Sequence, residues 1–194
     1  MADRERLRAL LVERSVRLGD FALRSGARSP YYIDARRTTM SAEGQFLVGK
    51  LGWALLCERT SNVSHIGGLT IGADPVAYAI AHRSWHEGRP VDAFSVRKRA
   101  KDHGMGQRIE GGLPGHARCV VVEDSMTTGK SALEAVTAVR THGATVVAVL
   151  TIVDREEGAA ALMAHECVPI LSLFTGRDLL SAAMGSGVVD PASR

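Results

Sequence analysis

The stretch VVVEDSMTTGKS, Val120 to Ser131, joins β-branched residues to two adjacent acids and then to a run of small hydroxyl and glycine residues. The valines predict a buried strand, and the run that follows predicts a turn into a helix. Its ending, Gly-Lys-Ser, is shared with the triphosphate-binding loop G-x-x-x-x-G-K-[ST]. That loop needs its first glycine at position 124, where this chain has Asp124, and a carboxylate there would repel phosphates. The stretch is therefore not a loop of that class.

A different anion site fits the same residues. The strand delivers Glu123 and Asp124 to the edge of a sheet, and the following residues, 125–129, allow backbone N–H groups to converge. A helix beginning near Ser131 points its positive end at the same place. Hydroxyl donors are added by Ser125, Thr127, Thr128 and Ser131. A phosphate cradle beside two acids that bind a diol predicts a site for a 5-phosphorylated ribose. Taken alone, an ordinary strand–turn–helix with solvated acids is the alternative.

Outward from this stretch, apolar runs of strand length alternate with segments of helical periodicity. Strands are expected at 63–66, 91–96, 119–122, 145–153 and 168–174. Helices are expected at 4–18, 42–59, from Asp74 onward, at 131–142 and at 156–165, with Asp74 as an N-cap and Gly19 as a C-cap. A short hairpin is expected within 21–34. This alternation predicts an α/β fold, a parallel sheet covered by helices on both faces.

Polar or glycine residues follow four of the expected strands: Gly67-Gly68, Arg97-Lys98, Glu123-Asp124 and Asp154-Arg155. Ligands of parallel sheets bind beyond the carboxyl ends of the strands, so these residues are expected to form one site. The segment 97–108 is also strongly basic, because a single acid, Asp102, faces Arg97, Lys98, Arg99, Lys101, His103 and Arg108. Such a cluster favours an anionic ligand.

Length, charge and cysteine pattern restrict the class of protein. The 194 residues, 45% of them hydrophobic, suit one domain over 1–184, with 185–194 as a disordered tail. A net charge of +3 does not indicate nucleic acid. No apolar run approaches the length of about 18 residues expected for a membrane span. The three cysteines lie far apart in apolar surroundings and the charged N-terminus lacks a signal-peptide core, so a cytoplasmic protein with reduced thiols is expected.

Three stretches resemble a known family. VVVEDSMTTGKS is similar to the phosphoribosyl-pyrophosphate motif of type I phosphoribosyltransferases. RKRAKDHGMGQRIEG, Arg97 to Gly111, resembles the mobile catalytic loop of orotate phosphoribosyltransferases, and FALRSGARSPYYID, Phe21 to Asp34, resembles their N-terminal hairpin. The likeness covers residues from about 20 to 160. It implies the type I phosphoribosyltransferase fold, a central, mostly parallel sheet with helices on both faces and a small N-terminal hood formed by residues 1–40.

The resemblance implies a reaction and the residues that carry it. The phosphoribosyl group of 5-phosphoribosyl 1-pyrophosphate moves to orotate, giving orotidine 5′-phosphate and pyrophosphate in de novo pyrimidine biosynthesis. Catalysis and diphosphate binding are assigned to Arg97, Lys98, Lys101 and His103. The remaining contacts to phosphoribosyl pyrophosphate are assigned to Arg24, Glu123, Asp124, Ser125, Met126, Thr127, Thr128, Gly129, Lys130 and Ser131. Orotate is assigned to Thr127, Arg155, Tyr32 and Ile33.

The resemblance also implies a metal and a partner. Mg²⁺ is a hard cation commonly carried by substrate phosphates, so no dedicated set of protein ligands is expected. The loop of this family usually reaches the neighbouring subunit's site, which implies a homodimer with the catalytic loop shared across subunits. Neither nucleic acid nor a membrane is an expected partner.

Two departures and two rival interpretations accompany the resemblance. Arg24 stands where the family often has lysine, and the segment between Gly68 and Tyr78 lacks the Tyr-Lys-Gly of some members. A phosphoribosyltransferase for a purine or uracil is one rival, although a neutral base does not need Arg155. A regulatory protein that keeps the pocket and binds nucleic acid is the other, and the arginines of the first helix are its only support.

Overall fold

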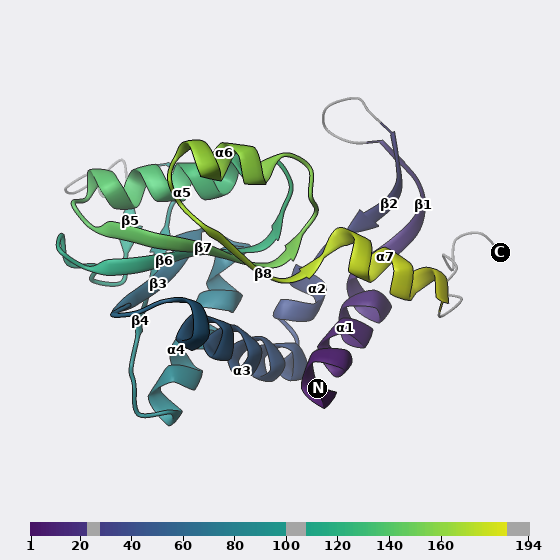
Figure 1. The fold of residues 1–194 in the computed structure, drawn as a ribbon, viewed down its shortest axis with the longest axis horizontal. Coiled ribbons are helices and arrows are strands. Elements are labelled where there is room, and N and C mark those ends of the chain that lie inside the picture. Colours follow the sequence, from purple (N-terminus) through teal and green to yellow (C-terminus); the bar gives the residue numbers. More distant parts are fainter. Residues whose placement is uncertain (23–27, 100–107, 186–194) are drawn as a thin grey trace.

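The computed structural model describes residues 1–22, 28–99 and 108–185, which fold around a six-stranded sheet of order β5-β4-β3-β6-β7-β8 (Figure 1). Its strands are β3 (His65–Leu69), β4 (Asp92–Val96), β5 (Ile109–Glu110), β6 (Arg118–Met126), β7 (Thr145–Asp154) and β8 (Ile170–Thr175). Five of them run parallel, and β5 is antiparallel to β4 at one edge. The observed sheet confirms the predicted α/β class.

Helices cover both faces of this sheet, as expected for parallel strands. One face packs against α5 (Lys130–Thr141) and α6 (Ala159–His165), and the other against α3 (Ala42–Arg59) and α4 (Ala73–His86) (Figure 1). The side chains that α5 buries have the spacing of one helical face: Ala132, Ala135, Val136 and Val139. Of the helices in the described ranges, none has the length and apolar character needed to cross a membrane.

The N-terminal part lies beside the sheet rather than in it. Helix α1 (Ala2–Ser15) packs on α3 and on α7 (Gly176–Gly185), and it adds Leu7, Leu10 and Leu11 to the core. A separate two-stranded hairpin follows, formed by β1 (Val16–Ala22) and β2 (Arg28–Ile33) (Figure 1). The short helix α2 (Arg36–Thr39) then leads back to α3, whose N-cap Ser41 accepts a hydrogen bond from the Gly44 amide at 3.1 Å.

The first helix was predicted to end three residues too late. It ends at Ser15, and Val16 is already extended, so the predicted C-cap Gly19 lies in the hairpin. Ser15 is buried and its hydroxyl lies 2.7 Å from that of Thr38, which fixes the end of the helix against α2. The hairpin is confirmed, but its first strand starts at Val16, earlier than predicted. The sequence did not reveal this start, because the apolar residues near Val16 fit the periodicity of a strand and of a helix equally well.

Other boundaries also differ from prediction. Strand β3 continues through Gly67-Gly68, and β6 continues through the acid pair to Met126. Asp74 is not an N-cap, because α4 is capped by Gly72, and the Asp74 carboxylate instead accepts a hydrogen bond from Ser95 at 2.6 Å. Helix α6 begins at Ala159 instead of 156, after the left-handed residues Glu156 and Gly158. Strand β5 and helices α2 and α7 were not predicted.

Candidate active site

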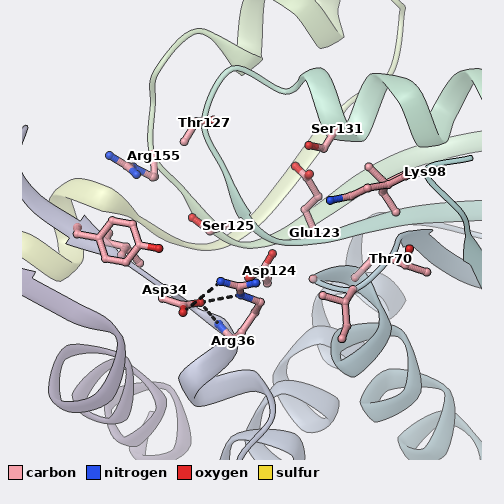
Figure 2. A pocket seen from close by; sticks show the side chains of 16 residues that line it. Asp34, Arg36, Thr70, Lys98, Glu123, Asp124, Ser125, Thr127, Ser131 and Arg155 are labelled. Atoms are coloured by element: carbon pink, nitrogen blue, oxygen red, sulfur yellow. Dashed lines mark hydrogen bonds and ion pairs between the residues drawn. The ribbon is translucent and has the colours of Figure 1, made fainter. Parts of the chain in front are cut away.

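A cavity of about 280 Å³ opens at the carboxyl edge of β3, β6 and β7, where the sequence placed the site (Figure 2). Nine residues with predicted roles line it: Tyr32, Ile33, Lys98, Glu123, Asp124, Ser125, Thr127, Ser131 and Arg155. The other lining residues are Asp34 and Arg36 after the hairpin, and Leu69, Thr70, Ile71, Gly72 and Ala73 between β3 and α4.

The two acids enter the cavity from opposite faces of β6, since neighbouring strand residues point in opposite directions. Glu123 points toward Ser131 and Lys98, and Asp124 points toward Asp34 and Arg36 (Figure 2). Gly72 lies so close to Asp124 that a Cβ there would meet the carboxylate oxygen at 2.4 Å. A side chain at position 72 would therefore displace this acid.

Burial shifts the pKa of both acids. Desolvation raises the pKa of Glu123 from 4.5 to about 7, with the Asp124 charge adding to the rise and a hydrogen bond from Ser131 opposing it. Desolvation also raises the pKa of Asp124, against hydrogen bonds from backbone amides and the nearby charge of Arg36. Two half-buried carboxylates whose charges act on each other favour a ligand that brings hydroxyl donors or positive charge.

The loop after β6 turns into α5 at Gly129, whose φ of 77° is left-handed. A Cβ at Gly129 would approach Ala159 of α6 at 3.2 Å, so the loop is closely packed from behind. Ser125, Thr127 and Ser131 face the cavity, but Met126 is fully buried in the core and the Thr128 and Lys130 side chains are exposed outside it. Any contact of Met126 with a ligand is thus limited to its backbone.

Arg155 lies at the opposite end of the cavity from Lys98 (Figure 2). Its side chain is only 7% exposed, lies 5.0 Å from the Tyr31 ring and pairs with Glu157 at 2.7 Å. Its Nε is buried without a hydrogen-bond partner. Tyr32 and Ile33 line the same cavity from β2. A desolvated guanidinium with a spare donor suits a planar, anionic ligand.

The predicted cations are only partly placed. Lys98 lines the cavity, whereas Arg97 points to Glu110, with 3.6 Å between Nη1 and the carboxylate, and is not among the lining residues. Arg24, Lys101 and His103 lie outside the described residues, as does the predicted tail from residue 186 onward. Gly185, also predicted as tail, is the last residue of α7.

Sequence reasoning missed Asp34 and Arg36 as residues of the cavity. They lie between the hairpin and α3, in a segment whose short helix left no periodic signal. Gly67-Gly68 was expected to belong to the site, and the segment that follows it, 69–73, lines the cavity. The Thr70–Ile71 peptide bond within it is cis.

No protein-family model matches the chain. The orotate phosphoribosyltransferase of Aquifex aeolicus (strain VF5) is 45% identical over 183 residues, which cover 93% of this chain and 99% of that protein. Two crystal structures of Mycobacterium tuberculosis H37Rv orotate phosphoribosyltransferase are also similar. The complex with Fe(III) dicitrate has a TM-score of 0.81 at 47% identity, covering 91% of this chain and 98% of that chain. The complex with 5-phospho-α-D-ribosyl 1-diphosphate has a TM-score of 0.78 at 43% identity, with the same coverage. The chain therefore belongs to the orotate phosphoribosyltransferase family.

Proposed function

We propose that this cavity is where the chain performs its family's reaction, the transfer of phosphoribose from phosphoribosyl pyrophosphate to orotate with release of pyrophosphate. The observation that carries the proposal is the placement of two desolvated acids, Glu123 and Asp124, directly before a glycine-turned loop that leads into α5. This is one continuous segment with an anion site at one end and a diol site at the other. Its two halves match the phosphate and the ring of a ribose 5-phosphate.

The phosphate end is built from backbone and hydroxyl donors. The amides at the start of α5 are free of intrahelical partners and carry the positive end of the helix dipole. Ser125, Thr127 and Ser131 line the cavity around them. The 5-phosphate binds there, and Glu123 and Asp124 accept hydrogen bonds from the ribose hydroxyls. Positive charge that develops on the ribose as the C1–O bond breaks lies next to both acids and is stabilised by them.

The diphosphate leaves from the side of the cavity where Lys98 lies. Lys98 stabilises its charge, together with Arg97, Lys101 and His103 in the roles that the resemblance gives them. Mg²⁺ would be carried in by the phosphates of the substrate, as the resemblance implies, and the carboxylates of Glu123 and Asp124 would attract it to the cavity when they are ionised. Mg²⁺ supplies charge neutralisation of the diphosphate.

Orotate binds at the other end, with its carboxylate on Arg155 and its ring beside Thr127, Tyr32 and Ile33. The guanidinium is held between Tyr31 and Glu157, so little conformational entropy is lost when it takes up the anion. A neutral base would leave this desolvated charge without a new partner, and orotate is preferred over uracil for that reason.

Arg155→Ala should raise the KM for orotate by about 10- to 100-fold, the range for hydrogen bonds to a charged group, with a smaller effect on the KM for phosphoribosyl pyrophosphate. Steady-state kinetics with each substrate varied in turn measures both constants. The matched control is Arg177→Ala, which removes an exposed arginine from the neighbouring α7 that pairs only loosely with Glu156, at 3.7 Å. An unchanged orotate KM in Arg155→Ala places the base elsewhere.

The working form is a cytoplasmic homodimer of one-domain subunits, residues 1–184, in which the catalytic loop of one subunit completes the site of the other. In support, large apolar side chains are exposed on α3, on α4 and beside the cavity: Met40, Phe46, Ile71, Tyr78 and Trp85. Ile71 also lines the cavity itself. Such exposure is costly in a monomer and is relieved by a second subunit.

A spectrophotometric assay tests the reaction directly. Orotate should be consumed only when phosphoribosyl pyrophosphate and Mg²⁺ are both present, and pyrophosphate should appear in equal amount. Uracil and adenine in place of orotate are the controls for base choice. Turnover of uracil or adenine without turnover of orotate would refute the proposal.

A further inference from the structure

Arg36 lines the cavity, and the proposed reaction does not yet use its charge. It begins α2, which is anchored to the protein interior through buried Ala35, Thr38 and Thr39. Asp34 fixes its guanidinium by accepting two hydrogen bonds, from Nε at 2.8 Å and from Nη2 at 3.2 Å. A guanidinium has five N–H donors, so three of them are left for another ligand. The arrangement is that of an oriented binding group, shown at the floor of the cavity in Figure 2.

The neighbours of Arg36 identify the part of the cavity that it serves. It lies near Asp124, whose pKa its charge lowers. It also lines two adjoining hollows together with Ile71, one of them the cavity described above and the other containing Arg37, Met40 and Ser41. Arg36 therefore lies beside the segment between β3 and α4, next to the acid that is assigned to the ribose.

The strand order shows what part of the substrate reaches this segment. Arg155 follows β7, the acids lie on β6, and residues 70–73 follow β3, which is the next strand on the other side of β6. With the base at Arg155 and the ribose over the acids, the group on C1 that leaves must extend toward β3. The segment 70–73 offers the diphosphate no cationic side chain of its own. Of the described residues that line the cavity, the cations other than Arg155 are Arg36 and Lys98.

We propose that Arg36, oriented by Asp34, binds the diphosphate of phosphoribosyl pyrophosphate and the pyrophosphate product; this inference rests on the proposed function. Its planar fork matches two phosphate oxygens at once. It stabilises the leaving group from below the ribose, and Lys98 does so from the side of β4. The Asp34 carboxylate keeps the guanidinium beside Asp124 when no ligand is bound, so little ordering is needed on binding.

Calorimetry with two ligands in Mg²⁺ buffer tests this role. Pyrophosphate and ribose 5-phosphate are titrated into the wild-type protein, Arg36→Ala, Arg36→Lys and the control Arg37→Ala, an exposed neighbour on the same helix. Arg36→Ala should weaken the binding of pyrophosphate by about 10- to 100-fold and should change the affinity for ribose 5-phosphate by no more than about threefold. Arg36→Lys should recover part of the loss, since it keeps the charge and loses the fork. In kinetics the KM for phosphoribosyl pyrophosphate should rise and that for orotate should not.

The outcomes separate the two proposals. Unchanged pyrophosphate affinity in Arg36→Ala, or an equal loss of both ligands, overturns the role of Arg36 and leaves the proposed function standing. A rise in the orotate KM alone also overturns it, because the guanidinium would then serve the base. If the wild-type protein itself takes up neither pyrophosphate nor ribose 5-phosphate, the proposed function fails and this inference with it.

Discussion

Glu123→Gln should lose about 100- to 1,000-fold in kcat/KM, the range for removal of one preorganised electrostatic group, and should nevertheless be more stable than the wild-type protein. The substitution keeps the shape and removes the negative charge beside the ribose. Glu123 is buried enough that its pKa is raised to about 7. The ionised Glu123 carboxylate is therefore expected to stabilise positive charge on the ribose, but in the ligand-free protein its desolvation lowers the free energy of unfolding.

The stability difference depends on pH in a defined direction. The folded protein keeps the Glu123 proton until about pH 7, whereas the unfolded chain releases it near 4.5. The wild-type free energy of unfolding therefore falls as pH rises between these values, and the loss is complete above pH 7. Glu123→Gln should match the wild type at pH 4 and exceed it by about 1 to 3 kcal/mol at pH 8.

Urea denaturation of ligand-free protein at the two pH values measures this difference. The control is Glu58→Gln, an exposed glutamate of α3, which should change neither activity nor the pH dependence of stability. The affinity of the wild-type protein for ribose 5-phosphate should also increase as pH passes through 7, because Glu123 becomes ionised there. Equal stability of Glu123→Gln and wild type at pH 8 contradicts the assigned burial of the charge.

The sheet and its site were predictable because two signals occur together in the sequence: apolar runs of strand length, and polar residues directly after them. Buried parallel strands produce continuous apolar runs, and polar residues at their carboxyl ends stand out against them. Lys98, Glu123, Asp124 and Arg155 were found in this way, far apart in sequence and together in the cavity. The local residue pattern predicted which segments are strands and which are helices. The polar residues could then be assigned to one site, because the carboxyl ends of parallel strands lie at the same edge of a sheet.

The missed features have no local pattern of that kind. Strand β5 is two residues long and exists through its pairing with β4, and α2 is a single turn held by Ser15 and Thr38. Asp34 and Arg36 depend on that turn, so sequence periodicity could not reveal them as cavity residues. The end of α1 was wrong for a related reason, since the strand that replaces its last turn is stabilised by a partner further along the chain.

If the catalytic loop is shared between subunits, as proposed, two inactive variants should restore each other's activity. Lys101→Ala and Asp124→Asn should each lose about 1,000-fold in activity, because each removes one charged group from the reacting centre. In a dimer that exchanges loops, a mixed pair has one site with the native acid from one subunit and the native lysine from the other. Random pairing makes half of the dimers mixed, and one of their two sites works, so about one quarter of wild-type activity should return.

Co-expression with two different affinity tags isolates the mixed dimer, in which about one half of wild-type activity is expected because one of its two sites works, and light scattering confirms its mass. The control is a mixed dimer of Asp124→Asn and Glu123→Gln. These two acids are adjacent on β6 of the same subunit, so each site of this dimer lacks one acid and activity should not return. Activity would return only if a site took its two acids from different subunits. A mixed dimer of Lys101→Ala and Asp124→Asn that stays inactive means that each loop serves its own subunit. A monomeric, fully active wild-type protein removes the dimer from the mechanism, and the exposed side chains of α3 and α4 then need another explanation.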